Sequence, residues 1–263
     1  WFRNVTLDSG LCMPTLRQTQ TGKGRPVMIE SEFLNTKVEG SLLIVEMNRP
    51  EKMNALHPPA NKALGEVFDA FAKDPDLWVA IITGAGDRAF SAGNDLRYQA
   101  EGGEMFSVPA GFGGLTNRYD LEKPVIAAVN GVAMGGGFEI ALACDLIIAA
   151  ATARFALPAP RVGFAALAGG LHRLPRQIPL KQAMGMILTG RHVLAEEGQR
   201  LGFVNEVVSQ DALMDTAKRW AGLIMECSPM SIRASKQAVM GGLDIADFET
   251  AFNTKFPAIR DML

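Results

Sequence analysis

The 263-residue sequence has few cysteines and lacks the cysteine patterns that mark metal or disulfide proteins. Its three cysteines, Cys12, Cys144 and Cys227, are odd in number and scattered along the chain. None of them shows the Cys-x-x-Cys spacing of a zinc site or a redox motif. We therefore expect no metal site and a reducing compartment, with a cytoplasmic location.

The sequence also lacks a strong net charge and any long uninterrupted apolar run. A formal charge of −2 creates no overall field that would attract nucleic acid or an anionic membrane. The longest apolar stretches, residues 124–137 and 145–160, are interrupted by Asn130 and by Arg154. Neither approaches the ~20 residues that a membrane-spanning helix needs. We expect neither a nucleic-acid partner nor a membrane, and the first residues lack the order of a secretory signal.

What the sequence has is enough apolar material for a large core, arranged as alternating strands and helices. Apolar residues make up 48% of the chain. Residues 1–26 have no clear periodicity, and we expect an irregular N-terminal extension there. From 27 to 190, patterns typical of strands alternate with helical ones, which predicts an α/β core. Residues 38–47 are predicted to form a strand pair with a Glu-Gly-Ser turn, and further strands are predicted over residues 78–83, 124–129 and 146–150.

Helical patterns fill the rest of the α/β core and dominate residues 191–263. One helix is predicted to begin at Pro58, where a missing N–H costs nothing, and another at Phe138 after a glycine-rich turn over residues 131–137. We expect a helical C-terminal region over residues 191–263. The helical periods near and within it cover residues 181–188, 195–201, 211–225, 231–240 and 247–256.

One glycine-rich segment, residues 84–89, formally matches the dinucleotide fingerprint GxGxxG/A, with Glu104 downstream. That fingerprint requires a helix to open inside the glycines. Residues 90–95 continue instead with small and polar residues that are typical of a loop. The sequence therefore does not favour a nucleotide cofactor.

A second glycine-rich segment, residues 130–139, lies between a predicted strand and a predicted helix. The triplet Gly135, Gly136 and Gly137 lets the backbone approach another group closely. Free N–H groups at the first turn of a helix point outward at the positive end of the helix dipole, so an anion can sit there. A tight crossover that needs glycine only for packing explains this segment equally well.

Three segments taken together resemble the signatures of the crotonase (enoyl-CoA hydratase/isomerase) family. They are residues 48–56 (Asn-Arg-Pro-Glu-Lys-Met-Asn-Ala-Leu), 89–96 (Ala-Phe-Ser-Ala-Gly-Asn-Asp-Leu) and 135–139 (Gly-Gly-Gly-Phe-Glu). Their order and separation match as well, and the resemblance runs from about Phe33 to Leu263. It implies a crotonase-like ββα spiral core with a helical C-terminal oligomerisation region, assembled as a homotrimer or homohexamer.

The resemblance also implies a chemistry. The substrate would be an acyl-CoA thioester, with no cofactor beyond its CoA moiety, and the backbone N–H groups of Asn94 and Gly136 would form an oxyanion hole. Such fixed dipoles stabilise the charge that gathers on the thioester oxygen as an enolate forms. Glu139 aligns with one of two family glutamates that handle protons and water. Its place at a helix N-terminus favours the carboxylate form, which suits a base.

The sequence departs from the family at Ala159, where the resemblance places the second glutamate. Hydration usually shares its proton transfers between the two carboxylates. One carboxylate suits a double-bond shift or another enolate reaction, such as decarboxylation or C–C cleavage. We nominally expect an enoyl-CoA hydratase, a carbon–oxygen lyase. An isomerase or other single-carboxylate enzyme, or a non-catalytic acyl-CoA-binding homologue, is the alternative.

The substrate-binding residues that the resemblance implies all lie in the matched segments or beside them. Lys52 and Arg97 are cations that could meet the phosphates of CoA. A surface lysine or arginine is more often simply solvated, so neither residue is specific alone. The predicted set is Ala92, Asn94, Asp95, Leu96, Arg97, Gly136, Lys52 and Ala55.

Overall fold

The computed structural model describes residues 18–19, 28–29 and 31–263. The extension predicted over residues 1–26 lies outside these residues, except for β1 (Gln18–Thr19). This strand pairs antiparallel with β2 (Met28–Ile29).

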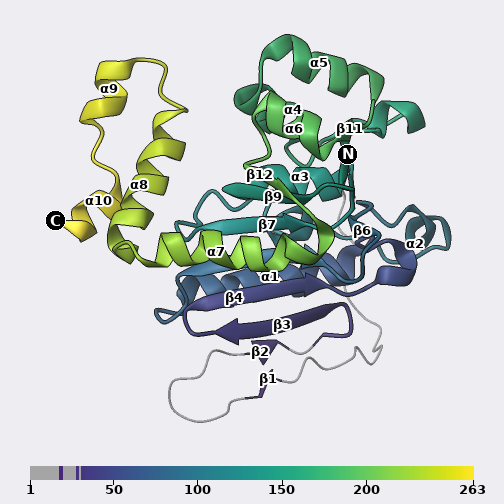
Figure 1. Cartoon of the computed structure of the whole chain (residues 1–263), viewed down its shortest axis with the longest axis horizontal. Helices are drawn as coiled ribbons and strands as arrows, with labels where there is room; N and C mark the ends of the chain where they lie inside the picture. Colours follow the sequence, from purple (N-terminus) through teal and green to yellow (C-terminus); the bar gives the residue numbers. More distant parts are fainter. Residues whose placement is uncertain (1–17, 20–27, 30) are drawn as a thin grey trace, which may run out of the picture.

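A six-stranded sheet forms the centre of the fold, in the order β12-β9-β7-β5-β4-β3 (Figure 1). Strands β3 and β4 form an antiparallel hairpin that turns at Gly40, whose φ of +60° suits glycine. The other pairings are parallel. Central strands β5 and β7 are buried along their whole length, as expected when both faces are covered. The strands are β3 (Leu34–Glu39), β4 (Leu42–Met47), β5 (Val79–Gly84), β7 (Val125–Val129), β9 (Leu146–Ala150) and β12 (Glu206–Val208).

A second, four-stranded sheet carries the segments that the resemblance singled out, in the order β11-β10-β8-β6. Strands β6 and β8 lie where the sequence predicted a loop and a glycine-rich turn, so those two predictions were partly wrong. Each strand has only three residues, too few to show a period of two. No helix opens over residues 84–89, so the dinucleotide fingerprint has no structural counterpart. The strands are β6 (Ala89–Ser91), β8 (Val132–Met134), β10 (Arg154–Ala156) and β11 (Val193–Leu194).

Helices cover the central sheet on both faces. Helices α1 (Pro58–Lys73) and α3 (Gly136–Ala143) contribute to the larger core cluster together with Leu43 and Val45 of β4. Helix α7 (Leu213–Met225) packs on the opposite face, against β5, β7 and β9, in a cluster that also contains the alternate residues Leu42 and Ile44 of β4. Successive strand residues therefore enter different cores, as the two-residue repeat of a strand requires.

The remaining helices confirm the helical character of the C-terminal third. The helix predicted over residues 247–256 ends at Asn253, and a separate helix, which the sequence did not predict, begins at Pro257. The residue before a proline is biased away from helical geometry, so the two do not join. Helices α8 to α10 lie together at one side of the sheets (Figure 1). The helices are α2 (Leu96–Ala100), α4 (Gly170–Gln177), α5 (Leu180–Thr189), α6 (Ala195–Leu201), α8 (Pro229–Gly242), α9 (Phe248–Asn253) and α10 (Pro257–Met262). Among the described helices, none is long and apolar enough to cross a membrane.

Three buried phenylalanines join the elements that carry the glycine triplet. The ring centroids of Phe138, Phe155 and Phe203 lie 5.1–5.2 Å apart. Because truncating a buried Phe leaves a cavity, we expect Phe155→Ala to lower the free energy of unfolding by about 3–5 kcal/mol in urea titrations. The control Tyr119→Ala removes a ring that is 85% exposed and should change it by less than about 0.5 kcal/mol. Equal losses in the two variants would contradict this account of the core.

Candidate active site

The chain after β6 and the glycine triplet meet in close backbone contact. A Cβ atom on Gly93 would lie 2.6 Å from the carbonyl oxygen of Met134 and 2.9 Å from the nitrogen of Gly136. A Cβ atom on Gly137 would lie 2.1 Å from the carbonyl oxygen of Ser91. No side chain fits at these distances, so the glycines are what allow the two segments to touch.

The backbone N–H of Asn94 is directed away from Leu56, the residue that lies beside it. Leu56 and Asn94 form an isolated parallel bridge, in which Leu56 N donates to Gly93 O at 2.8 Å and Asp95 N donates to Leu56 O at 3.0 Å. In a parallel ladder these bonds belong to the residues on either side of Asn94, so the N–H of Asn94 itself points outward. Asn94 is exposed, and its N–H is available to an external acceptor.

The backbone N–H of Gly136 is free for a different reason. Gly136 is the first residue of α3, and the first bond within the helix is donated by Glu139 N to Gly135 O, at 2.9 Å. N–H groups of a first helical turn have no acceptor inside the helix and lie at the positive end of its dipole. Because Gly136 N lies against Gly93, the structure places this donor beside the segment that carries Asn94.

Glu139 lies on the same first turn and is buried, with 4% of its surface exposed. Its Oε1 accepts a hydrogen bond from the N–H of Gly170, at 2.9 Å. Burial raises the pKa of Glu139, and the N–H groups of Gly170 and Ala168 and the charge of Arg173 oppose this only in part. This direction is opposite to the expectation that the helix terminus favours the carboxylate, because burial removes the carboxyl group from water.

Ala159 lies in a loop that leaves the small sheet next to the glycine triplet. Strand β10 pairs in parallel with β8, and Gly135 N donates to Ala156 O at 3.0 Å. The short 3-10 helix η3 (Ala159–Val162) follows this strand after two residues. The position that the resemblance gives to a second glutamate is therefore near the paired segments but carries a methyl group.

Arg173 was missed by the sequence reasoning. Its guanidinium donates to Thr116 O at 2.8 Å and to Ala168 O at 3.4 Å, and it also acts on the charge of Glu139. Both acceptors are backbone carbonyls, one of them from a loop far away in sequence. A hydrogen bond to a backbone carbonyl does not depend on the type of the accepting residue, so the sequence contains no pattern that predicts it.

The predicted substrate-binding residues divide into exposed and buried groups. Asp95 and Ala55 are buried, and both accept hydrogen bonds from the guanidinium of Arg49. Ala92 and Gly136 are half-buried. The exposed members are Asn94, Leu96, Arg97 and Lys52.

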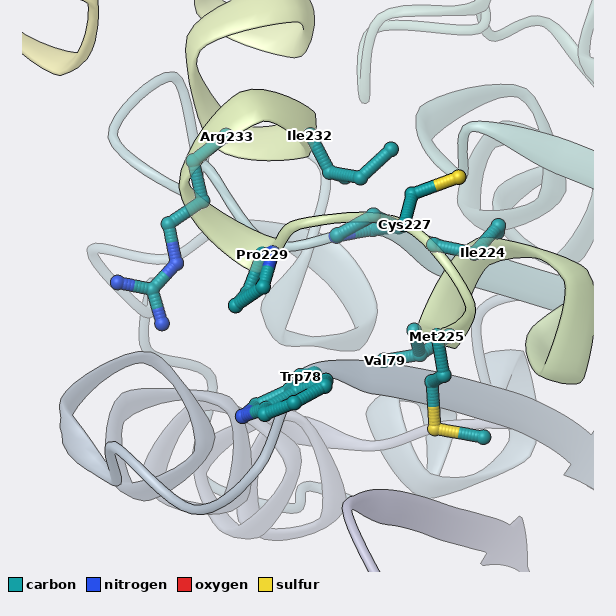
Figure 2. Close-up of a pocket in the computed structure, with 9 residues that line it drawn as sticks. Trp78, Val79, Ile224, Met225, Cys227, Pro229, Ile232 and Arg233 are labelled. Carbon is teal, nitrogen blue, oxygen red and sulfur yellow. The ribbon is translucent and has the colours of Figure 1, made fainter. Parts of the chain in front are cut away.

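A small, mostly apolar pocket lies apart from these residues, between the start of β5 and the junction of α7 and α8 (Figure 2). Trp78, Pro229 and Arg233 lie along one side of it, and Ile224 and Cys227 along the other. None of the candidate residues lines it. Within the described ranges, no group of three or more His, Cys, Asp or Glu side chains is placed to hold a metal ion.

The fold and the paired segments define an α/β protein of the crotonase class. The enoyl-CoA hydratase/isomerase profile matches residues 37–256, and the chain belongs to this family. A carnitinyl-CoA dehydratase of Citrobacter koseri is 48% identical over 209 residues, which cover 79% of this chain and 80% of that protein. A carnitinyl-CoA dehydratase of Salmonella agona is 47% identical over the same shares of the two chains.

Solved structures agree in fold. An enoyl-CoA hydratase from Mycobacterium marinum superposes with a TM-score of 0.82 at 35% identity, covering 88% of this chain and 90% of that one. A carnitinyl-CoA dehydratase from Mycobacterium avium superposes with a TM-score of 0.77 at 34% identity, covering 84% and 89%.

The raised pKa of Glu139 predicts a pH-dependent gain in stability when the carboxyl is removed. A carboxyl with a raised folded pKa binds more protons in the folded state, so its contribution to stability is full below the unfolded pKa and is lost as pH rises through the folded pKa. We expect the advantage of Glu139→Gln over the wild type to grow between about pH 4 and pH 8 in urea titrations. The exposed control Glu51→Gln should show no such trend. A constant difference for Glu139→Gln would contradict the prediction.

Proposed function

We propose that this chain removes water from, or adds it to, the C2–C3 bond of an acyl-CoA thioester, as an enoyl-CoA hydratase-type lyase. The observation that carries the proposal is the contact between two segments that each present a free N–H group, with buried Glu139 on the same helical turn as one of them. The names of the relatives, carnitinyl-CoA dehydratase and enoyl-CoA hydratase, support the same reaction.

The N–H groups of Asn94 and Gly136 bind the thioester oxygen. When the C2 proton is removed, negative charge moves to this oxygen, and the two dipoles are already in place to stabilise it. Removing one such donor typically costs roughly 2.7 to 4 kcal/mol of transition-state stabilisation. The exposed cations Lys52 and Arg97 are the proposed partners of the CoA phosphates.

Glu139 carries the proton. In the dehydration direction its carboxylate takes the C2 proton and the enolate forms. The C3–O bond then breaks as the C2–C3 double bond forms, and the departing hydroxide takes the proton from Glu139 to leave as water. One carboxylate suffices when proton and hydroxide leave from the same face. The raised pKa of Glu139 favours the protonated state that this return step needs, and the reaction requires no group beyond the CoA thioester.

Ala159 favours a second candidate, a double-bond shift. The methyl group there cannot activate water, whereas Glu139 could take a proton at C2 and return it at C4. The same oxygen-binding groups serve both reactions, since both pass through an enolate. Isomerisation of a 3-enoyl-CoA is therefore the alternative activity of this site.

The proposed assembly is a homotrimer or homohexamer. Apolar side chains of α9 and of the residues before it are strongly exposed in the single chain, with Phe248 at 82% and Phe252 at 78%. Exposed apolar patches of this kind typically mark contact surfaces. The proposed location is the cytoplasm, which suits the unpaired thiols of Cys144 and Cys227.

Deuterium exchange at C2 of a saturated acyl-CoA in heavy water tests enolate formation directly. We expect exchange with the wild type and a roughly 10²- to 10⁴-fold slower rate with Glu139→Gln, because the proton carrier is gone. Asn94→Pro removes the N–H donor and should slow exchange by about 10²- to 10³-fold, whereas Asn94→Ala keeps the donor and the rate. Binding of the thioester without any exchange would support a non-catalytic homologue instead.

Ala159→Glu tests whether one carboxylate is sufficient. The proposed mechanism uses Glu139 alone, so we expect the variant to change the hydration rate of an enoyl-CoA by less than about tenfold. The rate is followed by loss of the conjugated thioester absorbance. A gain of about 10²-fold or more would show that the chain is a hydratase lacking its second carboxylate. The control Ala159→Gln adds similar bulk without an acid.

A further inference from the structure

Arg49 is a buried cation that joins the two sides of the Leu56–Asn94 bridge. Only 7% of the residue is exposed. Its Nη1 donates to Ala55 O, and its Nη2 donates to Asp95 Oδ2 at 2.9 Å. Ala55 precedes Leu56 and Asp95 follows Asn94, so one guanidinium holds both strands of the bridge beside the free N–H.

Asp95 is fixed through its side chain and its backbone. Its other carboxylate oxygen accepts a hydrogen bond from Tyr98 N at 3.1 Å and caps α2, while its own N–H donates to Leu56 O at 3.0 Å. Burial alone would raise the pKa of Asp95, but the Tyr98 N–H and the Arg49 guanidinium outweigh it and lower the pKa. Asp95 is therefore ionised at neutral pH.

Hydrogen bonds from the backbone also hold the two residues before Asn94. Ala92 N donates to Met53 O at 2.9 Å, and Gly93 N donates to Ser91 Oγ at 3.1 Å. Ser91 Oγ in turn donates to Asn54 O at 2.8 Å. The N–H groups on both sides of Asn94 thus have partners within the chain, and the orientation of the Asn94 peptide is set by its neighbours.

The segment that contains Leu56, opposite Asn94, is preceded by a strained turn that also depends on Arg49. Met53 and Asn54 have φ values of 54° and 52°, a left-handed conformation that costs free energy in residues other than glycine. The side chain of Asn54 accepts from Arg49 N at 3.0 Å and donates to Ala85 O and Ala89 O at 3.0 and 2.8 Å. Arg49 therefore holds this turn through its backbone and the bridge through its side chain.

Two other ionisable side chains, His57 and Lys52, lie near the pair, but neither can take the place of Arg49 as the buried cation beside Asp95. His57 lies between the rings of Phe33 and Tyr98, and burial together with the charge of Arg49 lowers its pKa to about 4. It is uncharged at neutral pH. Lys52 Nζ lies 4.0 Å from Asp95 Oδ2, and its side chain is 43% exposed.

We propose that the buried Arg49–Asp95 pair is a positioning device that sets the direction of the Asn94 N–H in the oxyanion hole. The inference rests on the proposed role of Asn94 as a donor. In this proposal neither side chain touches the substrate, although Asp95 belongs to the predicted binding set, because it is buried and both of its oxygens have partners within the chain. Both side chains act through the peptide between Gly93 and Asn94. Arginine is required because its planar fork reaches two acceptors at once, which a lysine ammonium cannot do in the same geometry.

The test compares Arg49→Lys and Asp95→Asn with the wild type. We expect kcat for the dehydration or exchange reaction to fall roughly 10- to 100-fold, while KM changes less than about threefold, because a misdirected donor weakens the transition state more than binding. The second readout is a bound cinnamoyl-CoA thioester. Its absorption shifts to longer wavelength when the carbonyl oxygen accepts hydrogen bonds, and this shift should be smaller in both variants at saturation.

The matched control is Asp145→Asn, which weakens another partly buried pair. Asp145 Oδ2 accepts from Val125 N and from Lys236 Nζ, both at 2.8 Å, away from the paired segments. This variant should unfold at lower urea concentration with kcat and the absorption shift unchanged. If Arg49→Lys fails to fold, Asp95→Asn still decides the question, since its amide oxygen can cap Tyr98 N.

Two outcomes separate this inference from the function on which it rests. A wild-type protein that binds the thioester without an absorption shift would refute the oxyanion hole, and the positioning role with it. A wild-type shift that both variants retain at saturation, with kcat unchanged, would refute the positioning role alone.

Discussion

The contact between the chain after β6 and the glycine triplet is the constraint on which the site depends. Gly93 and Gly137 are in van der Waals reach of backbone atoms, so a side chain at either position would force the segments apart. The small sheet holds the contact, because β6 and β8 pair immediately before the two segments. The segments that carry the two proposed donors, the N–H groups of Asn94 and Gly136, therefore lie next to each other.

The first turn of α3 combines two features with opposite effects on a carboxyl group: the positive end of the helix dipole and burial away from water. Its glycines leave N–H groups without partners, and its fourth residue, Glu139, is a carboxyl removed from water. The raised pKa of Glu139 is a cost in stability near neutral pH that a proton carrier can use. Arg173 and Gly170 limit that cost without removing it.

Sequence reasoning recovered the features that depend on residues close together in the sequence. The central strands are short continuous apolar runs, the longer helices such as α1 and α7 have clear apolar periods, and the signature segments are contiguous in sequence. It missed short elements such as β6, β8 and α2, which have too few residues to show a period. It also gave the wrong direction for the pKa shift of Glu139, because the burial of this side chain depends on the loop before α4. The Arg49–Asp95 pair joins residues 46 positions apart, and no local pattern reports it.

Oxygen-binding groups supplied by the backbone have a consequence for how such a protein evolves. A point mutation at Asn94 replaces a side chain but leaves the peptide N–H, unless the new residue is proline. The proposed enolate site is thus largely insensitive to substitution at that position, whereas a proton-moving side chain such as the proposed Glu139 is lost with a single substitution. Substitutions of a few side chains can then change the reaction of such a site while its oxygen-binding groups remain in place.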